Sequence, residues 1–305
     1  MATDNSGLII VLIIFAAVIG IFVYAHLSKR VTADKRKAQI RAFKTAPKIA
    51  KDAPILVQGN AVAPDVILPS TGEHVAYYSM FVLSKESKIT GSRSSTRFRI
   101  NGIPLGSDGT RIEGVEGFMF HETSGDFTVE ASKTRYLVQP SGVFAYFKKG
   151  ADLVSGLVAG QFAAAGLPES FFQDAMNIRI AEPALAMFCG LDAPIVTEHS
   201  RKYSGSQGRI TTTGRTTFSV VMANSRIDSR VHTFVSGFSL PQGVVDLIEK
   251  RGIELPEKEE ILVVETFIPL NREVYVFGTF DGNGNIVYAD STSQLSVSYT
   301  DPGEE

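Results

Sequence analysis

The sequence predicts a mainly β protein of the α+β class: an N-terminal transmembrane helix followed by an antiparallel β domain with helical insertions. Three observations support this fold class. Residues 8–24 form an uninterrupted apolar run, β-branched and aromatic runs separated by turn residues begin at Ile55, and residues 151–191 are rich in Ala, Gly and Phe. The predicted organisation is an anchor, a basic helix, a β-rich domain and an acidic tail, over residues 1–27, 28–52, 53–292 and 293–305.

The first predicted element is the apolar run. No residue from Ser6 to Ala25 is charged, and about 20 helical residues at about 1.5 Å each span the roughly 30 Å hydrocarbon core of a bilayer. A cleaved signal peptide carries positive charge before its apolar run, whereas Met1 to Gly7 contains no Lys or Arg. We therefore expect an uncleaved single-pass anchor. A buried core helix and a prepilin-like leader are the alternatives.

A basic stretch follows the apolar run directly. Six of its residues are expected to lie at the membrane surface, next to anionic lipid headgroups: Lys29, Arg30, Lys35, Arg36, Lys37 and Arg41. These charges could instead serve only to fix the topology. Because Lys and Arg stay on the cytoplasmic side, the expected localisation is a membrane protein with its N-terminus outside and its C-terminal domain in the cytoplasm.

The remainder of the chain is acidic. Residues 53–305 hold 21 Lys and Arg against 29 Asp and Glu. A protein that binds nucleic acid needs a basic surface, so nucleic acid is not an expected partner.

The first half of the β domain contains several strand-like runs. The predicted strands are Ile55–Gly59, His74–Leu83, Arg97–Ile100, Gly117–His121, Phe127–Glu130 and Thr134–Val138. The polar segment from Ser84 to Ser95 is expected to be a loop, and Ser124–Asp126 a hairpin turn.

Strands resume after the helical middle of the chain. Ile210–Ala223 and Ser229–Phe238 are expected to form a long antiparallel pair. Gly205–Gly208 and Thr213–Arg215 are expected to be hairpin turns. Leu240–Gly252 has the pattern of a short amphipathic helix that ends at its glycine. A strand meander is expected to follow, over Ile261–Ile268, Glu273–Phe280 and Ile286–Asp290.

The helical middle, Ala151–Leu191, is expected to break near Gly166–Pro168 and again at Pro183. It contains Gly156 and Gly160, a spacing of small residues that lets helices approach closely. We interpret these two glycines as helix-packing residues. The segment is either a membrane-dipping or oligomerising helix, or a helical insertion that packs on the sheet.

The sequence predicts no catalytic, cofactor-binding or metal-ligating residue. Cys189 is the single cysteine, which excludes an intrachain disulfide, and its apolar neighbours predict a buried structural thiol. Asp281–Asn285 imitates the start of a calcium loop but is expected to be a turn, since Ile286 and Thr292 stand where the loop needs Gly and Glu. Glu265 lies in an apolar strand and needs a partner if buried, either in a structural ion pair or as a binding-site carboxylate.

Several short segments resemble parts of one known domain. Gln58–Val62 and Leu68–Tyr78 resemble the opening of the GIDE domain, also called the beside-a-membrane domain. Phe118–Val129 is similar to its mid-domain strand, turn and strand. Pro241–Leu247 and Val264–Gly278 are similar to its closing helix and strands.

This resemblance covers residues 54–150 and 235–290. It implies a membrane-apposed β domain for protein interactions. In eukaryotes the domain belongs to mitochondrial-membrane E3 ubiquitin ligases, whose zinc RING lies elsewhere in the chain, and RING-less relatives occur in bacteria and archaea. With one cysteine this chain has no RING, so ligase activity is not implied.

The expected function is that of a single-pass, membrane-anchored, non-catalytic interaction or scaffold protein at the cytoplasmic membrane face. Its expected partners are the lipid bilayer, an unidentified membrane or cytoplasmic protein, and further copies of itself in a homo-oligomer. Two alternatives stand beside it: a subunit of an oligomeric membrane assembly or transport complex, and a membrane-bound hydrolase with an unrecognised site.

Overall fold

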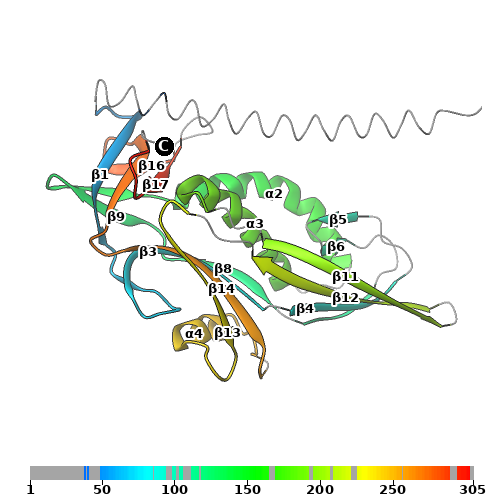
Figure 1. Ribbon diagram of the computed structural model, residues 1–305. Helices are drawn as coiled ribbons and strands as arrows, with labels where there is room; N and C mark the ends of the chain where they lie inside the picture. The colour runs from blue at the N-terminus through cyan, green and yellow to red at the C-terminus, as the bar shows by residue number, and fades with distance from the viewer. Residues whose placement is uncertain are drawn as a thin grey trace, which may run out of the picture.

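The computed structural model describes residues 38, 40, 49–84, 86–93, 98–100, 103–105, 111–116, 118–164, 169–191, 195–206, 209–220, 225–255, 257–288 and 294–302 (Figure 1). It is 44% strand and 24% helix, so the predicted mainly β class is confirmed. The apolar run at residues 8–24 lies outside the described residues. Among the helices that are described, none is long and apolar enough to cross a bilayer.

A five-stranded sheet forms the centre of the molecule. It contains β13 (Asp228–Val235), β14 (Glu260–Pro269), β3 (His74–Ser84), β2 (Val66–Ile67) and β8 (Met119–Thr123). The order is β13-β14-β3-β2, and β8 also pairs with β3. Both central strands, β14 and β3, are buried along nearly their whole length. This agrees with their continuous apolar sequence, which is typical of a strand covered on both faces.

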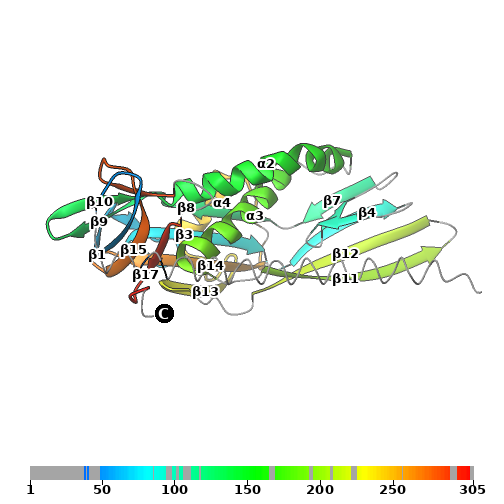
Figure 2. The ribbon, with the colours of Figure 1, turned by 90° about the horizontal axis from the view of Figure 1, so that it is seen from above.

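A six-stranded sheet lies at one end of this centre (Figures 1 and 2). Its order is β1 (Ala53–Ala63), β9 (Phe127–Ala131), β10 (Thr134–Val138), β16 (Asn285–Val287), β15 (Glu273–Phe280) and β17 (Ser296–Ser298). Because β1 also pairs with β15, the sheet closes on itself. Gly59 of β1 is needed there, since a Cβ on it would lie 2.4 Å from the carbonyl oxygen of Glu130.

A four-stranded sheet extends from the opposite end of the molecule (Figure 2). It consists of β11 (Ile195–Ser206), β12 (Arg209–Val220), β4 (Glu86–Arg93) and β7 (Arg111–Glu116), in that order. A short hairpin of β5 (Phe98–Ile100) and β6 (Ile103–Leu105) completes the strands.

The four-stranded sheet corrects three sequence predictions. The expected loop from Ser84 to Ser95 contains β4, and Thr213–Arg215 lies inside β12 instead of at a turn. The expected partnership of β12 with β13 is also wrong: β12 pairs with β11 and β4, and β13 pairs with β14. The β4 sequence has a weak strand signal of its own, and cross-strand pairing decides its conformation.

Two helices cover one face of the central sheet, and a third covers the other (Figure 1). The pair is α2 (Ser141–Ala164) and α3 (Glu169–Cys189), and the third is α4 (Gln242–Lys250), within the predicted amphipathic segment. The helical region thus begins before the expected start at Ala151. Pro183 does not break α3, because its neighbours Ala184 and Leu185 are fully buried and their packing offsets the lost backbone hydrogen bond.

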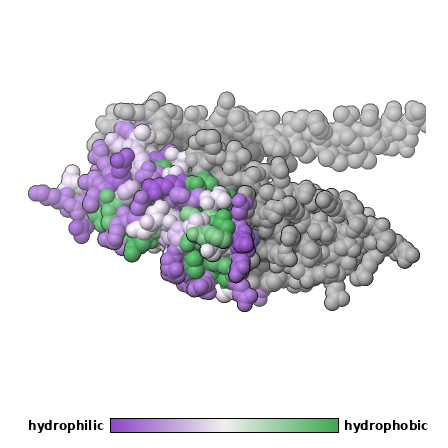
Figure 3. All heavy atoms as spheres, turned by 60° about the horizontal axis from the view of Figure 1, so that its bottom comes forward, coloured by the Kyte–Doolittle hydropathy of each residue, from purple (hydrophilic) through white to green (hydrophobic). Residues whose placement is uncertain are grey.

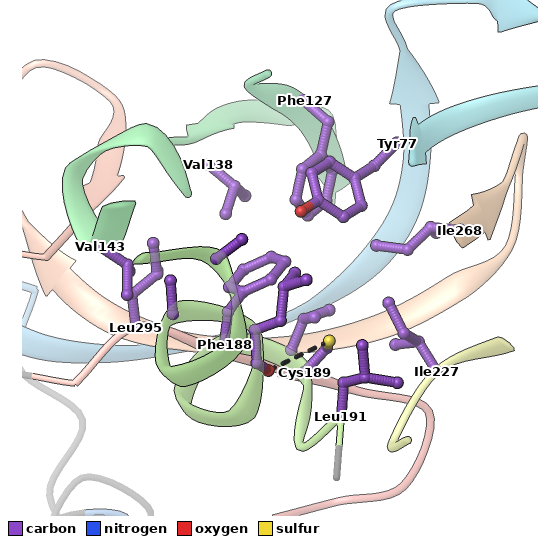
Figure 4. Packing of buried hydrophobic residues seen from close by; sticks show 14 of the residues in the cluster. Tyr77, Phe127, Val138, Val143, Phe188, Cys189, Leu191, Ile227, Ile268 and Leu295 are labelled. Carbon is purple, nitrogen blue, oxygen red and sulfur yellow. Dashed lines mark hydrogen bonds between the residues drawn. The ribbon is translucent and has the colours of Figure 1, made fainter. Parts of the chain in front are cut away.

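Each face of the sheet has its own hydrophobic core. The larger core joins α3 to the central and six-stranded sheets through Tyr77, Phe127 and Phe188, whose rings lie 5.4 to 6.3 Å apart (Figure 4). The smaller core lies under α4 and contains Val244 and Ile248. The two cores place α3 and α4 on opposite faces of one sheet.

The C-terminal region also differs from expectation. The predicted meander is split between sheets, since β14 belongs to the central sheet and β15 to the six-stranded one. The predicted acidic tail, 293–305, contains β17, which pairs with β15 and is buried. The expected turn at Asp281 is confirmed: its Oδ1 accepts hydrogen bonds from the backbone N–H groups of Asn283 and Asn285.

Candidate functional site

The predicted site residues fall into two groups. The membrane-surface residues Lys29, Arg30, Lys35, Arg36, Lys37 and Arg41 lie outside the described residues. Gly156 and Gly160 lie in α2, which contacts α3. Their proposed role in helix packing stays a prediction.

Glu265 is the most informative buried polar residue. It lies on β14, facing the smaller core, and is fully buried. The Ser70 hydroxyl donates a hydrogen bond to its Oε2, and His232 Nε2 lies 3.1 Å from Oε1. The expectation that a buried Glu265 has a partner is confirmed.

The fold brings these three side chains together from distant parts of the sequence. Glu265 and His232 come from the neighbouring strands β14 and β13. Ser70 comes from the turn after β2, where Leu68 accepts the backbone N–H of Gly72. This turn lies directly against α4. Gly243 of α4 makes the close approach possible, since a Cβ at this position would lie 2.6 Å from the Pro69 carbonyl oxygen.

Two further charged residues extend this cluster toward solvent. Arg230, directly opposite Glu265 on β13, donates from Nη1 to Glu73 Oε2 at 2.9 Å and places its guanidinium 4.5 Å from the Phe267 ring centre.

The Glu265 carboxylate stands between Ser70 and His232. In a Ser-His-acid triad the serine is instead bonded to the histidine, and the acid lies on the far side of that histidine. The cluster therefore has the geometry of a structural clamp between β13, β14 and the turn at Ser70.

The open side of the central sheet is the edge strand β13. Among the described strands β13 pairs with β14 alone. Tyr299 covers its first residues, since the Tyr299 hydroxyl donates to Asp228 Oδ2 at 2.9 Å. Further along, Val231 is 43% exposed, and the turn that follows β13 presents Phe238 at 75% exposure. Unpaired strand edges and exposed aromatic rings are both features of binding surfaces.

The opposite edge, β8, is closed by a side chain. Arg251, just after α4, donates from Nη2 to the His121 carbonyl oxygen at 3.2 Å and to Glu122 at 2.9 Å. Its Nη1 reaches Asp174 of α3 at 3.0 Å. The guanidinium also lies 4.3 Å from the Phe120 ring centre. One residue thus joins the helices on both faces of the sheet across the β8 edge.

His121 lies inside this closed edge. Its ring is stacked on Phe144 of α2 and lies tilted against Phe81 of β3, and Nε2 lies 2.7 Å from the Ser79 hydroxyl. Burial, and secondarily the charge of Arg251, lower the pKa of His121 to about 3. His121 is therefore neutral near pH 7 and acts as a packing and hydrogen-bonding residue.

Cys189 is buried, as expected. Its thiol donates to the Leu185 carbonyl oxygen at 3.3 Å, and burial raises its pKa (Figure 4). A nucleophilic cysteine needs a lowered pKa and access to solvent, so this environment fits a structural thiol.

Sequence reasoning singled out Glu265 and missed Ser70, Arg230, Arg251 and Phe238. A partial signal for Phe238 was present, because Gly237 and Ser239 on either side of it are turn residues. The other three contacts carry no local signal, because each joins segments far apart in the chain.

No family description, curated protein or solved structure matches this chain at a significant level. Within the part of the chain that the structure describes, no group of three or more His, Cys, Asp or Glu side chains could hold a metal ion.

Proposed function

We propose that this protein is a single-pass membrane-anchored, non-catalytic interaction domain that works at the cytoplasmic membrane face. The apolar run at residues 8–24 and the basic stretch behind it support the anchor and its orientation. The resemblance to the GIDE domain, itself a proposal, is consistent with this function.

The observation that carries the proposal is the open edge of the central sheet. β13 offers backbone donors and acceptors next to exposed Val231, and the clamp of Glu265, His232 and Ser70 holds the strand in place. A rigid edge strand can accept an extended segment of a partner as an added strand. The partner is an unidentified membrane or cytoplasmic protein.

The test is site-specific photo-crosslinking with full-length protein in intact membranes. A photoreactive residue replaces Val231 on the open edge, and a control replaces Tyr146 on α2, which is comparably exposed at 40%. The proposal predicts a discrete crosslinked product from position 231 that is weak or absent from position 146. A similar smear of products from both positions would contradict an interaction surface at β13.

The anchor is tested separately. The full-length chain is expected in the membrane fraction, with its C-terminal domain protected when protease is added outside sealed cells. Recovery in the soluble fraction, or digestion of the C-terminal domain from outside, would overturn the membrane part of the proposal.

A further inference from the structure

An exposed apolar patch lies at the end of the central sheet, beside α4. We call it the Phe238 patch; it consists of Phe238 and the half-buried side chains that surround the smaller core at this end: Phe234, Leu240, Leu247, Ile253 and Leu255. Figure 3 shows hydrophobic residues gathered on this side of the molecule, bordered by hydrophilic ones. Contiguous apolar surface of this kind is typical of a docking site.

The turn that carries Phe238 is held by its own hydrogen bonds. The Val235 carbonyl oxygen accepts the backbone N–H groups of Phe238 and Ser239, and the Ser239 hydroxyl accepts the N–H of Val235. Gly237 adopts a φ of +77°, which lets the chain reverse tightly. Ser236 also joins the turn to Glu259, by a backbone bond and a side-chain bond. The phenyl ring is therefore presented to solvent by an ordered turn, which lowers the entropic cost of binding.

The border of the patch is acidic. The exposed acidic residues that form it, on α4 and on the segment from α4 to β14, are Asp246, Glu249, Glu254 and Glu257. The basic residues in the same stretch are Lys250, Arg251 and Lys258. Arg251 is already bound to Glu122 and Asp174, so it does not offset the border. The patch thus combines an apolar centre with a net negative border.

We propose that the Phe238 patch docks a basic amphipathic segment of a partner protein. Phe238 inserts between the partner's apolar side chains, and the partner's Lys or Arg residues meet the acidic border. Charge complementarity of this kind selects the partner and speeds association. This inference rests on the proposed interaction function and adds the chemistry of the partner to it.

The same charges argue against a lipid surface as the occupant. Anionic headgroups of the inner leaflet are repelled by an acidic border. The patch also lies on the opposite side of the molecule from β1, where the chain enters the β domain after the basic stretch (Figure 1). The patch is therefore on the side away from the point at which the chain continues toward the predicted anchor.

The test measures binding of full-length protein, held in phosphatidylcholine nanodiscs, to defined probes. The probes are an amphipathic Lys/Leu peptide, its Glu/Leu counterpart, a scrambled Lys/Leu peptide and phosphatidylserine vesicles. Phe238→Ser is expected to weaken binding of the Lys/Leu peptide about tenfold or more, since a Phe side chain leaves the interface. Joint Glu254→Lys and Glu257→Lys substitution is expected to weaken it about tenfold at low salt and less at high salt.

Two matched variants serve as controls. Ile67→Ser removes an apolar side chain that is 61% exposed on β2, and Glu169→Lys reverses an exposed charge at the start of α3. Neither is expected to change binding of the Lys/Leu peptide.

Three results would overturn the inference: no preference for the Lys/Leu peptide over its Glu/Leu and scrambled counterparts, a loss of vesicle binding on Phe238→Ser, or equal losses from the control variants. The crosslinking at Val231 separates this failure from that of the proposed function. A discrete product at Val231 together with no peptide preference leaves the interaction function standing and removes only the partner chemistry.

Discussion

The two edges of the central sheet are treated in opposite ways. At β8, Arg251 bridges α3 and α4, bonds the strand's own carbonyl oxygen at His121 and lies over Phe120. At β13 the backbone edge stays open beyond Tyr299, with Val231 and Phe238 exposed beside it. Unprotected edges invite unwanted pairing. The fold thus protects the β8 edge with a dedicated side chain and, among the described residues, leaves the backbone of β13 without a second strand partner.

The largest expected effect comes from the clamp that holds the open edge. His232→Ala leaves the fully buried Glu265 carboxylate with Ser70 as its remaining partner, and should lower the free energy of unfolding by about 3 kcal/mol. His232→Gln keeps a donor within reach and should cost about 1 kcal/mol. Urea unfolding of both variants checks this. Equal losses would show that packing of the ring, and not the hydrogen bond to Glu265, holds β13.

The next effect concerns the closed edge. Arg251→Ala removes ion pairs to two partly buried carboxylates, Glu122 and Asp174, and should lower the free energy of unfolding by about 2 kcal/mol. Arg135→Ala, which breaks an exposed pair with Glu130, should cost less than about 0.5 kcal/mol.

Exposure of the β8 edge adds a second readout. If Arg251 protects that edge, its Ala variant should also self-associate more strongly in sedimentation than the parent protein. Unchanged association would mean that the helices alone protect β8.

The closed edge should also respond to acid. His121 has its pKa lowered from 6.5 to about 3, so the unfolded chain binds more protons than the folded chain between these values. Stability is therefore lost as pH falls through this window, by at most about 1.4 kcal/mol per pH unit from this residue.

His121→Gln cannot titrate but can still bond Ser79, and so isolates this contribution. Carboxylates titrate alike in both proteins, and the difference in urea midpoints between neutral pH and about pH 4.5 should be smaller in the variant. Parallel pH profiles would show that His121 does not drive the acid sensitivity.

The smallest effect on stability is expected at the open edge itself. Val231→Lys places a charge on an exposed position of β13 and should change the free energy of unfolding by less than about 0.5 kcal/mol. It should still reduce crosslinking from a neighbouring photoreactive residue at Thr233, because a lysine on an edge discourages strand addition. A large loss of stability would mean that Val231 packs within the protein and is not available to a partner.

Local sequence patterns predicted individual elements well where their signal was strong. The β10 and β15 bounds, Thr134–Val138 and Glu273–Phe280, agree with expectation residue for residue. The helix over Gln242–Lys250 and the turn at Asp281 were also predicted, since amphipathic spacing and Asx hydrogen bonding are local properties. Burial of Cys189 followed from its apolar neighbours, and Glu265, which lies in an apolar strand, was expected to need a partner if buried.

Pairing between elements could not be predicted in the same way. Adjacent strands such as β12 and β13 were expected to form a hairpin, yet they belong to different sheets. The polar β4 sequence becomes a strand only between β12 and β7. These outcomes depend on contacts between residues far apart in the chain, and no window of neighbouring residues contains that information.

The amino-acid sequence by itself determined the β-rich class, most strand and helix positions and the need of a buried Glu265 for a partner. Only the tertiary structure decided that this partner is His232 with Ser70, that Arg251 closes one edge, and that β13 and Phe238 remain exposed at the other. The physical reason is range: backbone propensity and hydrophobic periodicity act over a few residues, whereas edges, cores and charge clusters exist only once distant segments meet.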